Sequence, residues 1–237
     1  MVKIIKMGCL QFNGMPVELG VPYSKERISF GDSIPGNAIP FVKWGELLVA
    51  SRCICMGVSW EELDSEGFIL GRPITIDGTS YLCRSLKVGE DDDTPSEWDA
   101  ILDDLGEDDF YWNWFGQFFW GQEAVHSCPP TCACRGYDSA RHWEKFGSGI
   151  RDSSIGFRPI LEPLPPAPLL SNFLIGSNLA IHGPGSEICG KLVDFNEYDL
   201  VIHPPVPLAL LSYCNWAVSA GDNIIIDRSA VVWMKEN

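Results

Sequence analysis

The chain has 237 residues, of which 46% are hydrophobic and 21% charged, and its formal net charge is −15. This composition excludes an intrinsically disordered protein, and the length suits one or two domains. No apolar run approaches the ~18 residues that a membrane span requires, and the first residues lack the pattern of a cleaved signal peptide. Neither a membrane partner nor secretion is expected.

Nine cysteines are scattered along the chain. A secreted disulfide framework usually has an even number of cysteines and a signal peptide. We therefore expect reduced thiols and a cytoplasmic location.

Residues 1–89 predict short strands that are interrupted by glycine and proline. The clearest pattern is "PITIDGTSYLCRSL", in which alternating apolar residues flank Asp77-Gly78. This dipeptide accepts the positive φ values of a two-residue turn, so a β-hairpin is predicted here.

A helix is predicted next. Thr94 is the expected N-cap, Pro95 the first helical residue and Gly106 the C-terminal stop, and Glu97 is placed for a capping box. Apolar residues at helical spacing predict one buried stripe. The stripe consists of Trp98, Ile101, Leu102 and Leu105.

Residues 90–109 contain eleven acidic residues and no basic one. Such a segment repels phosphate backbones, so nucleic acid is not an expected partner. A calcium site and a mimic of nucleic-acid charge are the alternatives to a plain solvated helix face. The spacing of "EDDD" does not match a calcium loop.

Residues 110–120, "FYWNWFGQFFW", hold eight aromatic residues. Aromatic runs of this kind are typical of a hydrophobic core, and we expect these side chains to be buried.

The segment that follows contains Arg135-Gly136 and, after a mixed run, Gly156-Phe157-Arg158. This pattern resembles the C-terminal signature of the formylglycine-generating-enzyme/C-type-lectin superfamily, over roughly residues 40–162. The resemblance implies a rigid sheet scaffold with Arg158 holding neighbouring carbonyls or a carboxylate. It allows either a copper-dependent oxidase with reactive cysteines or a binding protein whose mixed run forms the ligand surface, as in the variable proteins of diversity-generating retroelements.

Aromatic and arginine side chains beside small polar ones are typical of recognition surfaces. We therefore expect the binding function, with no catalytic residue and no cofactor. The candidate ligand-binding residues are Tyr137, Asp138, Ser139, His142, Trp143, Glu144, Lys145, Phe146 and Arg151.

The cysteines of "CPPTCAC" are the candidates for metal binding or redox chemistry. Cys128, Cys132 and Cys134, with His126, could bind zinc or form a redox pair, but the spacing matches no common zinc signature. We expect no metal, and these thiols to be structural or incidental.

A proline-rich connector, residues 163–170, leads into a second domain, residues 171–237. Its first half resembles the first motif of Sm-like proteins of the Hfq type, a family of small bent β-barrels that assemble into rings and often bind RNA. An insert at 203–218 departs from the minimal fold, and the basic-His pair of that family is replaced by Arg228-Ser229. The matching motif residues are Gly190, Leu192, Phe195, Asn196 and Tyr198.

The sequence thus predicts a β-rich α+β protein with a lectin-like domain over 1–162 and an Sm-like barrel over 171–237. We expect a non-enzymatic protein of phage or prophage origin in a bacterial cytoplasm, binding a protein or small molecule and forming a homo-oligomer through the barrel. The alternatives are a phage counter-defence inhibitor, acting as an acidic mimic or a nucleotide-signal sponge, an oxidase of the formylglycine-generating type, and an Sm-like RNA binder.

Overall fold

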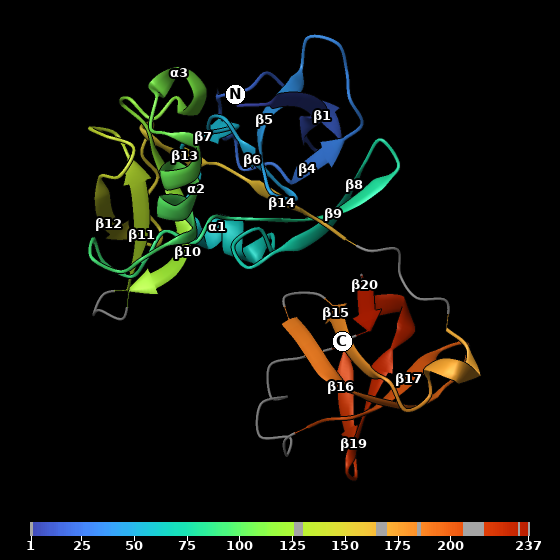
Figure 1. Cartoon of the computed structure of the whole chain (residues 1–237). Coiled ribbons are helices and arrows are strands. Elements are labelled where there is room, and N and C mark those ends of the chain that lie inside the picture. The colour runs from blue at the N-terminus through green and yellow to red at the C-terminus, as the bar shows by residue number, and fades with distance from the viewer. Residues whose placement is uncertain are drawn as a thin grey trace. The chain divides into compact units, whose positions relative to one another are not determined.

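The fold was obtained as a computed structural model, which describes residues 2–125, 130–164, 170–183, 186–205, 216–231 and 233–236. Strands make up most of its regular structure, so the expected β-rich α+β class is confirmed. The chain divides into two compact units, Met1–Leu164 and Pro165–Asn237, which are coloured blue to yellow and orange to red in Figure 1. No helix in the described ranges is long and apolar enough to cross a membrane.

The first sheet of unit 1 has the strand order β2-β1-β5-β6-β14-β9-β8, with β4 also paired to β1. The predicted hairpin at Asp77-Gly78 is confirmed, since Ile76 pairs with Thr79 and both turn residues have positive φ. The strands are β1 (Ile4–Phe12), β2 (Met15–Pro16), β4 (Ile28–Gly31), β5 (Ala38–Trp44), β6 (Leu47–Ala50), β8 (Arg72–Ile76), β9 (Thr79–Arg84) and β14 (Ile160–Pro163).

The second sheet of unit 1 has the order β12-β11-β10-β13-β7-β3. It carries the segment between Arg135-Gly136 and Gly156-Phe157-Arg158. Strand β10 lies at its centre, antiparallel to β11 and parallel to β13. The strands are β3 (Val21–Pro22), β7 (Cys55–Met56), β10 (Phe118–Val125), β11 (Thr131–Gly136), β12 (Trp143–Gly147) and β13 (Ile155–Phe157).

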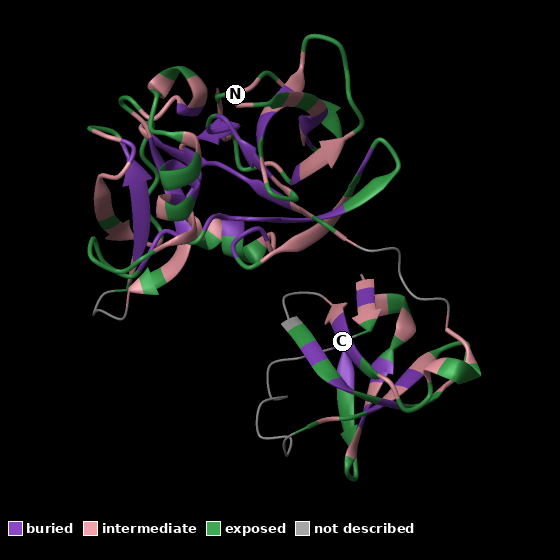
Figure 2. Ribbon diagram, viewed as in Figure 1, coloured by how far each residue is buried: buried purple, intermediate pink, exposed green. Residues whose placement is uncertain are grey.

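Three helices accompany these sheets: α1 (Trp60–Ser65), α2 (Glu97–Leu105) and α3 (Asp109–Trp112). The predicted stripe of α2 is confirmed, since Trp98, Ile101 and Leu102 are buried and Leu105 packs against the same core cluster. Figure 2 shows buried residues along the strands, and exposed ones mainly in the loops and on the outer face of α2.

The predicted start of α2 was wrong. Ser96 is the N-cap, and its hydroxyl accepts a hydrogen bond from the Asp99 amide at 3.1 Å. The Thr94 hydroxyl is engaged elsewhere, because it donates to the Asp91 carboxylate at 2.6 Å. Glu97 forms no capping box and instead pairs with Arg84. Gly106 ends the helix with a φ of 83°, as expected.

The described residues of unit 2 form a sheet with the order β18-β19-β17-β16-β15-β20 and their own hydrophobic core. A Cβ at Gly190 would lie 2.4 Å from Ile202 Cγ2, so only glycine lets β17 lie so close to β16 at this point. The strands are β15 (Asn178–Gly183), β16 (Ser186–Phe195), β17 (Asp199–His203), β18 (Ala217–Ala220), β19 (Asn223–Asp227) and β20 (Trp233–Glu236), with 3₁₀ turns at η1 (Asn172–Leu174) and η3 (Arg228–Ala230).

Candidate recognition surface

Arg135, the first residue of the Arg135-Gly136 pair, is a buried structural residue. Its side chain is 1% exposed and donates through Nε to the Val88 carbonyl at 3.0 Å. Through Nη2 it pairs with Asp99 at 2.9 Å, and through Nη1 it donates to the Arg141 carbonyl. Burial lowers the pKa of this guanidinium, against the opposing effect of the nearby carboxylates. Arg135 therefore joins β11 to α2 and to the loop after Tyr137.

Gly136 and Tyr137 bring the chain to the surface. A Cβ at Gly136 would lie 2.3 Å from the Gln117 carbonyl oxygen, and its φ is 112°, so glycine is required. Tyr137 also has a positive φ, 76°, which is rare for a bulky residue and costs about 1–3 kcal/mol. Three backbone hydrogen bonds of 2.9–3.0 Å hold it there: its N–H donates to Trp114 and Gln117, and its carbonyl accepts from Gly116.

The ring of Phe118 is the platform on which the displayed side chains rest. Tyr137 stacks on it at 4.9 Å and 12°, while His142 and Phe146 lie at 5.5 and 5.2 Å. Phe118 is 7% exposed, but Tyr137 remains 40% exposed. Three of the candidate residues therefore converge on one buried ring, and Tyr137 is the most accessible of the aromatic members.

The loop between Tyr137 and β12 is closed by its own hydrogen bonds. The His142 amide donates to Ser139 Oγ at 3.0 Å, and the His142 carbonyl accepts from Gly136 at 3.0 Å. Asp138 is exposed, and its carboxylate lies 3.6 Å from His142 Nδ1, too far for a hydrogen bond. The loop thus presents Asp138 to solvent beside Tyr137.

The other candidate residues do not join this group. Successive side chains of a strand point to opposite faces, so Trp143 and Lys145 leave β12 on the side away from Glu144 and Phe146. Trp143 packs against the core beside α2 and donates to the Gly89 carbonyl at 3.0 Å.

Arg151 lies in different surroundings again. Its guanidinium pairs with Glu62 of α1 and lies 5.5 Å from the Tyr23 ring centroid. The structure thus separates the candidates: Tyr137, His142 and Phe146 meet at Phe118, Trp143 packs against the core beside α2, and Arg151 lies on α1. Lys145 of β12 is exposed and Glu144 is half-buried.

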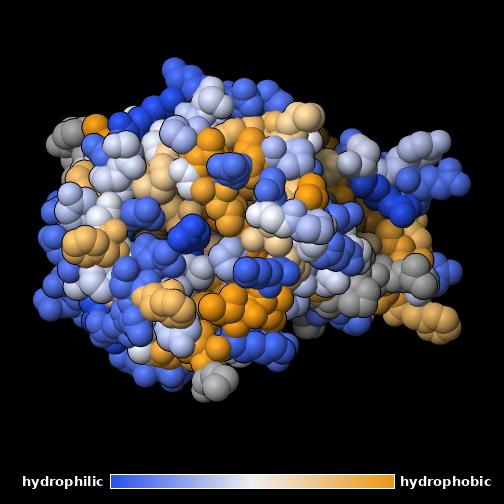
Figure 3. Space-filling view, turned by 90° about the horizontal axis from the view of Figure 1, so that it is seen from above, coloured by the Kyte–Doolittle hydropathy of each residue, from blue (hydrophilic) through white to orange (hydrophobic). Residues whose placement is uncertain are grey.

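Two exposed aromatic residues were missed, because the run 110–120 was predicted to be core. Trp112, Phe118, Phe119 and Trp120 are buried, but Phe110 is 78% exposed and Phe115 is 75% exposed. Helix α3 is only four residues long and is followed by Asn113 in the left-handed conformation, so neighbouring residues point in different directions. Figure 3 shows hydrophobic side chains reaching the surface among hydrophilic ones on the face seen from above.

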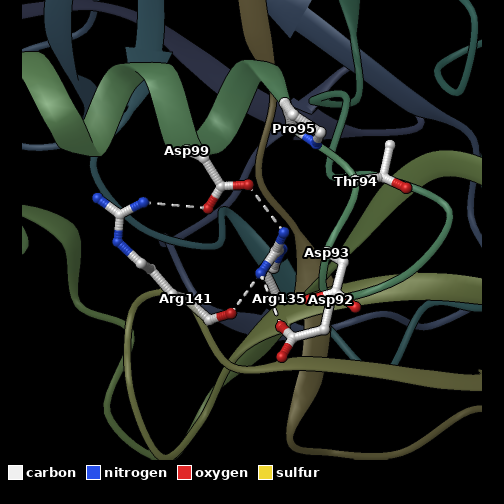
Figure 4. A pocket seen from close by; sticks show the side chains of 7 residues that line it. All are labelled: Asp92, Asp93, Thr94, Pro95, Asp99, Arg135 and Arg141. Atoms are coloured by element: carbon white, nitrogen blue, oxygen red, sulfur yellow. Dashed lines mark hydrogen bonds and ion pairs between the residues drawn. The ribbon is translucent and has the colours of Figure 1, made fainter.

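An acidic pocket of about 440 Å³ lies between α2 and the Arg135–Arg141 segment. Arg141 pairs with Asp99, Asp103 and Glu107 at 3.4, 2.7 and 2.6 Å, and the hydrogen bond that its Nε donates to Glu107 is the main cause of its raised pKa. Figure 4 shows the Asp99 carboxylate between the two guanidinium groups. The pocket is lined by Asp92, Asp93, Thr94, Pro95, Asp99, Arg135 and Arg141.

Most carboxylates of the acidic run 90–109 have a partner inside the protein. Glu97 pairs with Arg84 at 2.7 Å, and Asp104 accepts from the Trp44 indole at 2.7 Å. Asp108 caps α3, and Asp109 accepts from the Phe115 amide at 2.9 Å. These contacts favour a structural role for the run over a mimic of nucleic acid.

The described thiols of the "CPPTCAC" segment, Cys132 and Cys134, are buried and are poor nucleophiles. Burial, with Glu61 and Asp64 nearby, raises the pKa of Cys132 to about 12, and burial raises that of Cys134 well above its usual value. Thiols of this kind are protonated at neutral pH, whereas the thiolate is the reactive and metal-binding form. The other two candidates, His126 and Cys128, lie outside the described residues, and within those residues no three His, Cys, Asp or Glu side chains gather as a metal site.

No protein-family model, curated protein or solved structure matches this chain.

Proposed function

We propose that this chain is a non-enzymatic binding protein that recognises a protein or small-molecule ligand through the surface around Tyr137. The observation that carries the proposal is the conformation of Tyr137, an exposed aromatic residue held at positive φ by three hydrogen bonds and stacked on Phe118. Strain of this kind persists where the surrounding structure enforces it, and it clusters at functional sites. Aromatic anchors held rigidly lose little entropy on binding.

The positions of Gly136 and Gly156 in the second sheet support a C-type-lectin-like scaffold for unit 1. Gly136 pairs with Phe118 on one side of β10, and Gly156 pairs with Phe119 on the other. The mixed run between them starts and ends at the central strand and reaches the surface in between. Arg158 is fully buried and donates to backbone carbonyls, which is the role that the resemblance implies for it.

The burial of Cys132 and Cys134, which are 1% and 0% exposed, supports binding over oxidase chemistry, since reactive cysteines need to be accessible to their substrate. All the described cysteines are free thiols, which fits the proposed setting of a bacterial cytoplasm and a phage or prophage origin.

Unit 2 supports the proposal of a homo-oligomer. In its described part, β18 and β20 are the outer strands of the sheet. Outer strands offer backbone groups for pairing with another chain, and several copies of one binding surface raise avidity. Native mass measurement of the full chain checks this, and a purely monomeric mass would contradict it.

RNA binding by unit 2 is the second candidate function, favoured by one observation. Tyr198 is 75% exposed, and Arg228 is joined to the same turn, because its amide donates to the Tyr198 carbonyl and its guanidinium to the Asn196 carbonyl. An aromatic ring next to an arginine can stack a base. The surplus of acidic residues in 171–237, seven against three basic, opposes this function.

The primary proposal is tested by a photo-crosslinking amino acid, p-benzoylphenylalanine, placed at position 137 in cells of a bacterial host. We expect a discrete covalent adduct at position 137. The matched control carries the same residue in place of Phe173, which is 97% exposed in unit 2. Equal adducts at both positions, or none at 137, would contradict the proposal.

A further inference from the structure

We infer that the ligand of this surface is a cationic protein segment, in which lysine or arginine side chains accompany apolar ones. The inference rests on the proposed function and names the chemistry of its partner. The proposed contact surface is an aromatic patch made of Phe110, Phe115 and Tyr137, together with the carboxylates that surround it.

The aromatic patch comes from two segments that are joined through their backbones. Phe115 and Tyr137 form a β-bridge, and the Tyr137 amide donates to the Trp114 carbonyl at 3.0 Å. Phe110 belongs to α3, and Asp109 of the same helix accepts from the Phe115 amide at 2.9 Å. The three rings are therefore attached to one hydrogen-bonded framework.

The rings of the patch remain exposed although each of them contacts one neighbouring ring: Tyr111 for Phe110, Trp114 for Phe115 and Phe118 for Tyr137. Phe110 and Phe115 are 78% and 75% exposed, and Tyr137 is 40% exposed. Exposed aromatic residues gathered in one place mark interaction sites more often than single exposed residues do. Rings of this kind are the usual anchors of protein interfaces.

The charge around the patch selects the partner. Residues 103–115 and 137–142 contain six carboxylates and a single arginine, Arg141, whose guanidinium already pairs with three carboxylates. Asp138, beside Tyr137, is 75% exposed, and its carboxylate lies 3.6 Å from His142 Nδ1. Two further cations lie close to Asn113: Arg52 donates to its side chain at 2.8 Å, and the buried Arg158 donates to the Trp112 carbonyl at 2.6 Å.

Aromatic faces and carboxylates attract the same kind of group. A guanidinium or ammonium ion binds over an aromatic ring by cation–π attraction, and it pairs with a carboxylate by charge. Phosphates and acidic peptides are repelled by the same surroundings. A second copy of this chain, with its net charge of −15, would also bring repulsion to the patch.

The probe that tests this inference is a library of short random peptides, selected on the full chain and counter-selected on the double variant Phe110→Ser, Phe115→Ser. We expect the retained peptides to be rich in lysine and arginine beside apolar residues. Synthetic, fluorescein-labelled copies of them should bind the double variant about tenfold more weakly than the wild type. Binding should also weaken as salt is added.

Two controls separate the patch from general attraction to an acidic protein. Phe173→Ser removes an exposed phenylalanine from unit 2, and Glu46→Gln removes a carboxylate that is 87% exposed elsewhere in unit 1. Both should leave the affinity unchanged, whereas Asp138→Asn should lower it. Because Phe110 and Phe115 are exposed, the double variant should have the same melting temperature as the wild type.

The inference would be overturned if the retained peptides were acidic or neutral, or if the selection retained no peptide. It would also be overturned if basic peptides bound the double variant as well as the wild type. The proposed function is judged separately by the adduct at position 137. If that adduct forms while the peptides contradict the inference, binding at this surface stands and only the chemistry of the partner is wrong.

Discussion

Arg158 shows how a single residue positions the aromatic patch. Its side chain is fully buried, and Nη2 donates to the Trp112 carbonyl at 2.6 Å. Nη1 donates to the carbonyls of Ala50 and Ser51 at 3.4 and 3.3 Å. The guanidinium therefore ties the end of α3, which lies between Phe110 and Phe115 in the chain, to the end of β6. Burial lowers its pKa, and its position 4.7 Å from the Phe119 ring centroid supplies part of the missing solvation.

Replacing Arg158 by methionine should reduce the free energy of unfolding by about 3 kcal/mol, because buried carbonyls lose their donor. Urea unfolding followed by near-ultraviolet circular dichroism measures this. Arg27→Met, at an exposed arginine, should stay within about 0.5 kcal/mol of the wild type. Equal effects of the two changes would show that Arg158 does not hold the end of α3.

At the scale of elements, α2 is held by its cap and by a buried ion pair. Ser96 caps its first turn, and Glu97 binds Arg84 of β9 through two contacts of 2.8 and 2.7 Å. Both side chains are largely buried, at 9% and 13% exposure. The helix is therefore attached to the first sheet through Glu97 and, through Asp99 and Arg135, to the second.

Ser96→Ala should lower the free energy of unfolding by about 1 kcal/mol, the usual cost of losing a serine cap. Thermal or urea unfolding measures the difference, with Ser24→Ala at an exposed loop position as the matched control. Thr94→Ala should not remove a helix cap, because the Thr94 hydroxyl donates its hydrogen bond to Asp91 and not to α2. No loss in Ser96→Ala would contradict the capping assignment.

The Arg84–Glu97 pair also predicts a dependence on pH. Burial alone would raise the pKa of the Glu97 carboxyl, but the hydrogen bonds and charge of Arg84 outweigh it and hold the pKa below 4.5. Unfolded Glu97 then binds a proton at higher pH than folded Glu97, so acid favours unfolding. The stabilisation is complete above the unfolded pKa and is lost as the pH falls through the folded one.

Glu97→Gln should therefore show a smaller loss of stability than the wild type when the pH is lowered below 4.5, although it is less stable at neutral pH. Unfolding free energies measured across this range test it. Glu46→Gln, at an exposed carboxylate, should follow the wild-type curve. Parallel curves for Glu97→Gln and the wild type would contradict the prediction.

At the scale of the whole molecule, the two units have separate hydrophobic cores. The core clusters of unit 1 contain no residue beyond Leu161, and the cluster of unit 2 begins at Leu170. Each unit thus buries its own apolar side chains, which is the condition for a domain to fold by itself. The predicted connector, residues 163–170, spans the boundary between the units, and its residues 165–169 lie outside the described structure.

Separate fragments, residues 1–164 and 165–237, should each unfold cooperatively, since neither core needs the other. Circular dichroism during heating measures this, and the sum of the fragment spectra should match the full chain. If the proposed oligomer forms through unit 2, the fragment 165–237 should retain it and the fragment 1–164 should be a monomer. A fragment without a cooperative transition would contradict the division.

The residues alone determined the features that depend on near neighbours in the chain. Asp77-Gly78 specified a hairpin because few other residues accept two positive φ values, and the spacing of Trp98, Ile101 and Leu102 specified the buried face of α2. The β-rich class followed in the same way from short alternating segments broken by glycine and proline. Each of these is a local preference, which the surrounding protein did not have to supply.

The tertiary structure alone decided which side chains became the surface. Phe110 and Phe119 belong to the same aromatic run, yet only the second is buried, because Phe119 lies on β10 in the middle of a sheet and Phe110 lies on the four-residue helix α3. Likewise Arg151 and Tyr137 belong to the same mixed run but lie in different surroundings, since one docks on α1 and the other on β10. Exposure depends on contacts between residues far apart in the sequence, and these form only when the sheets come together.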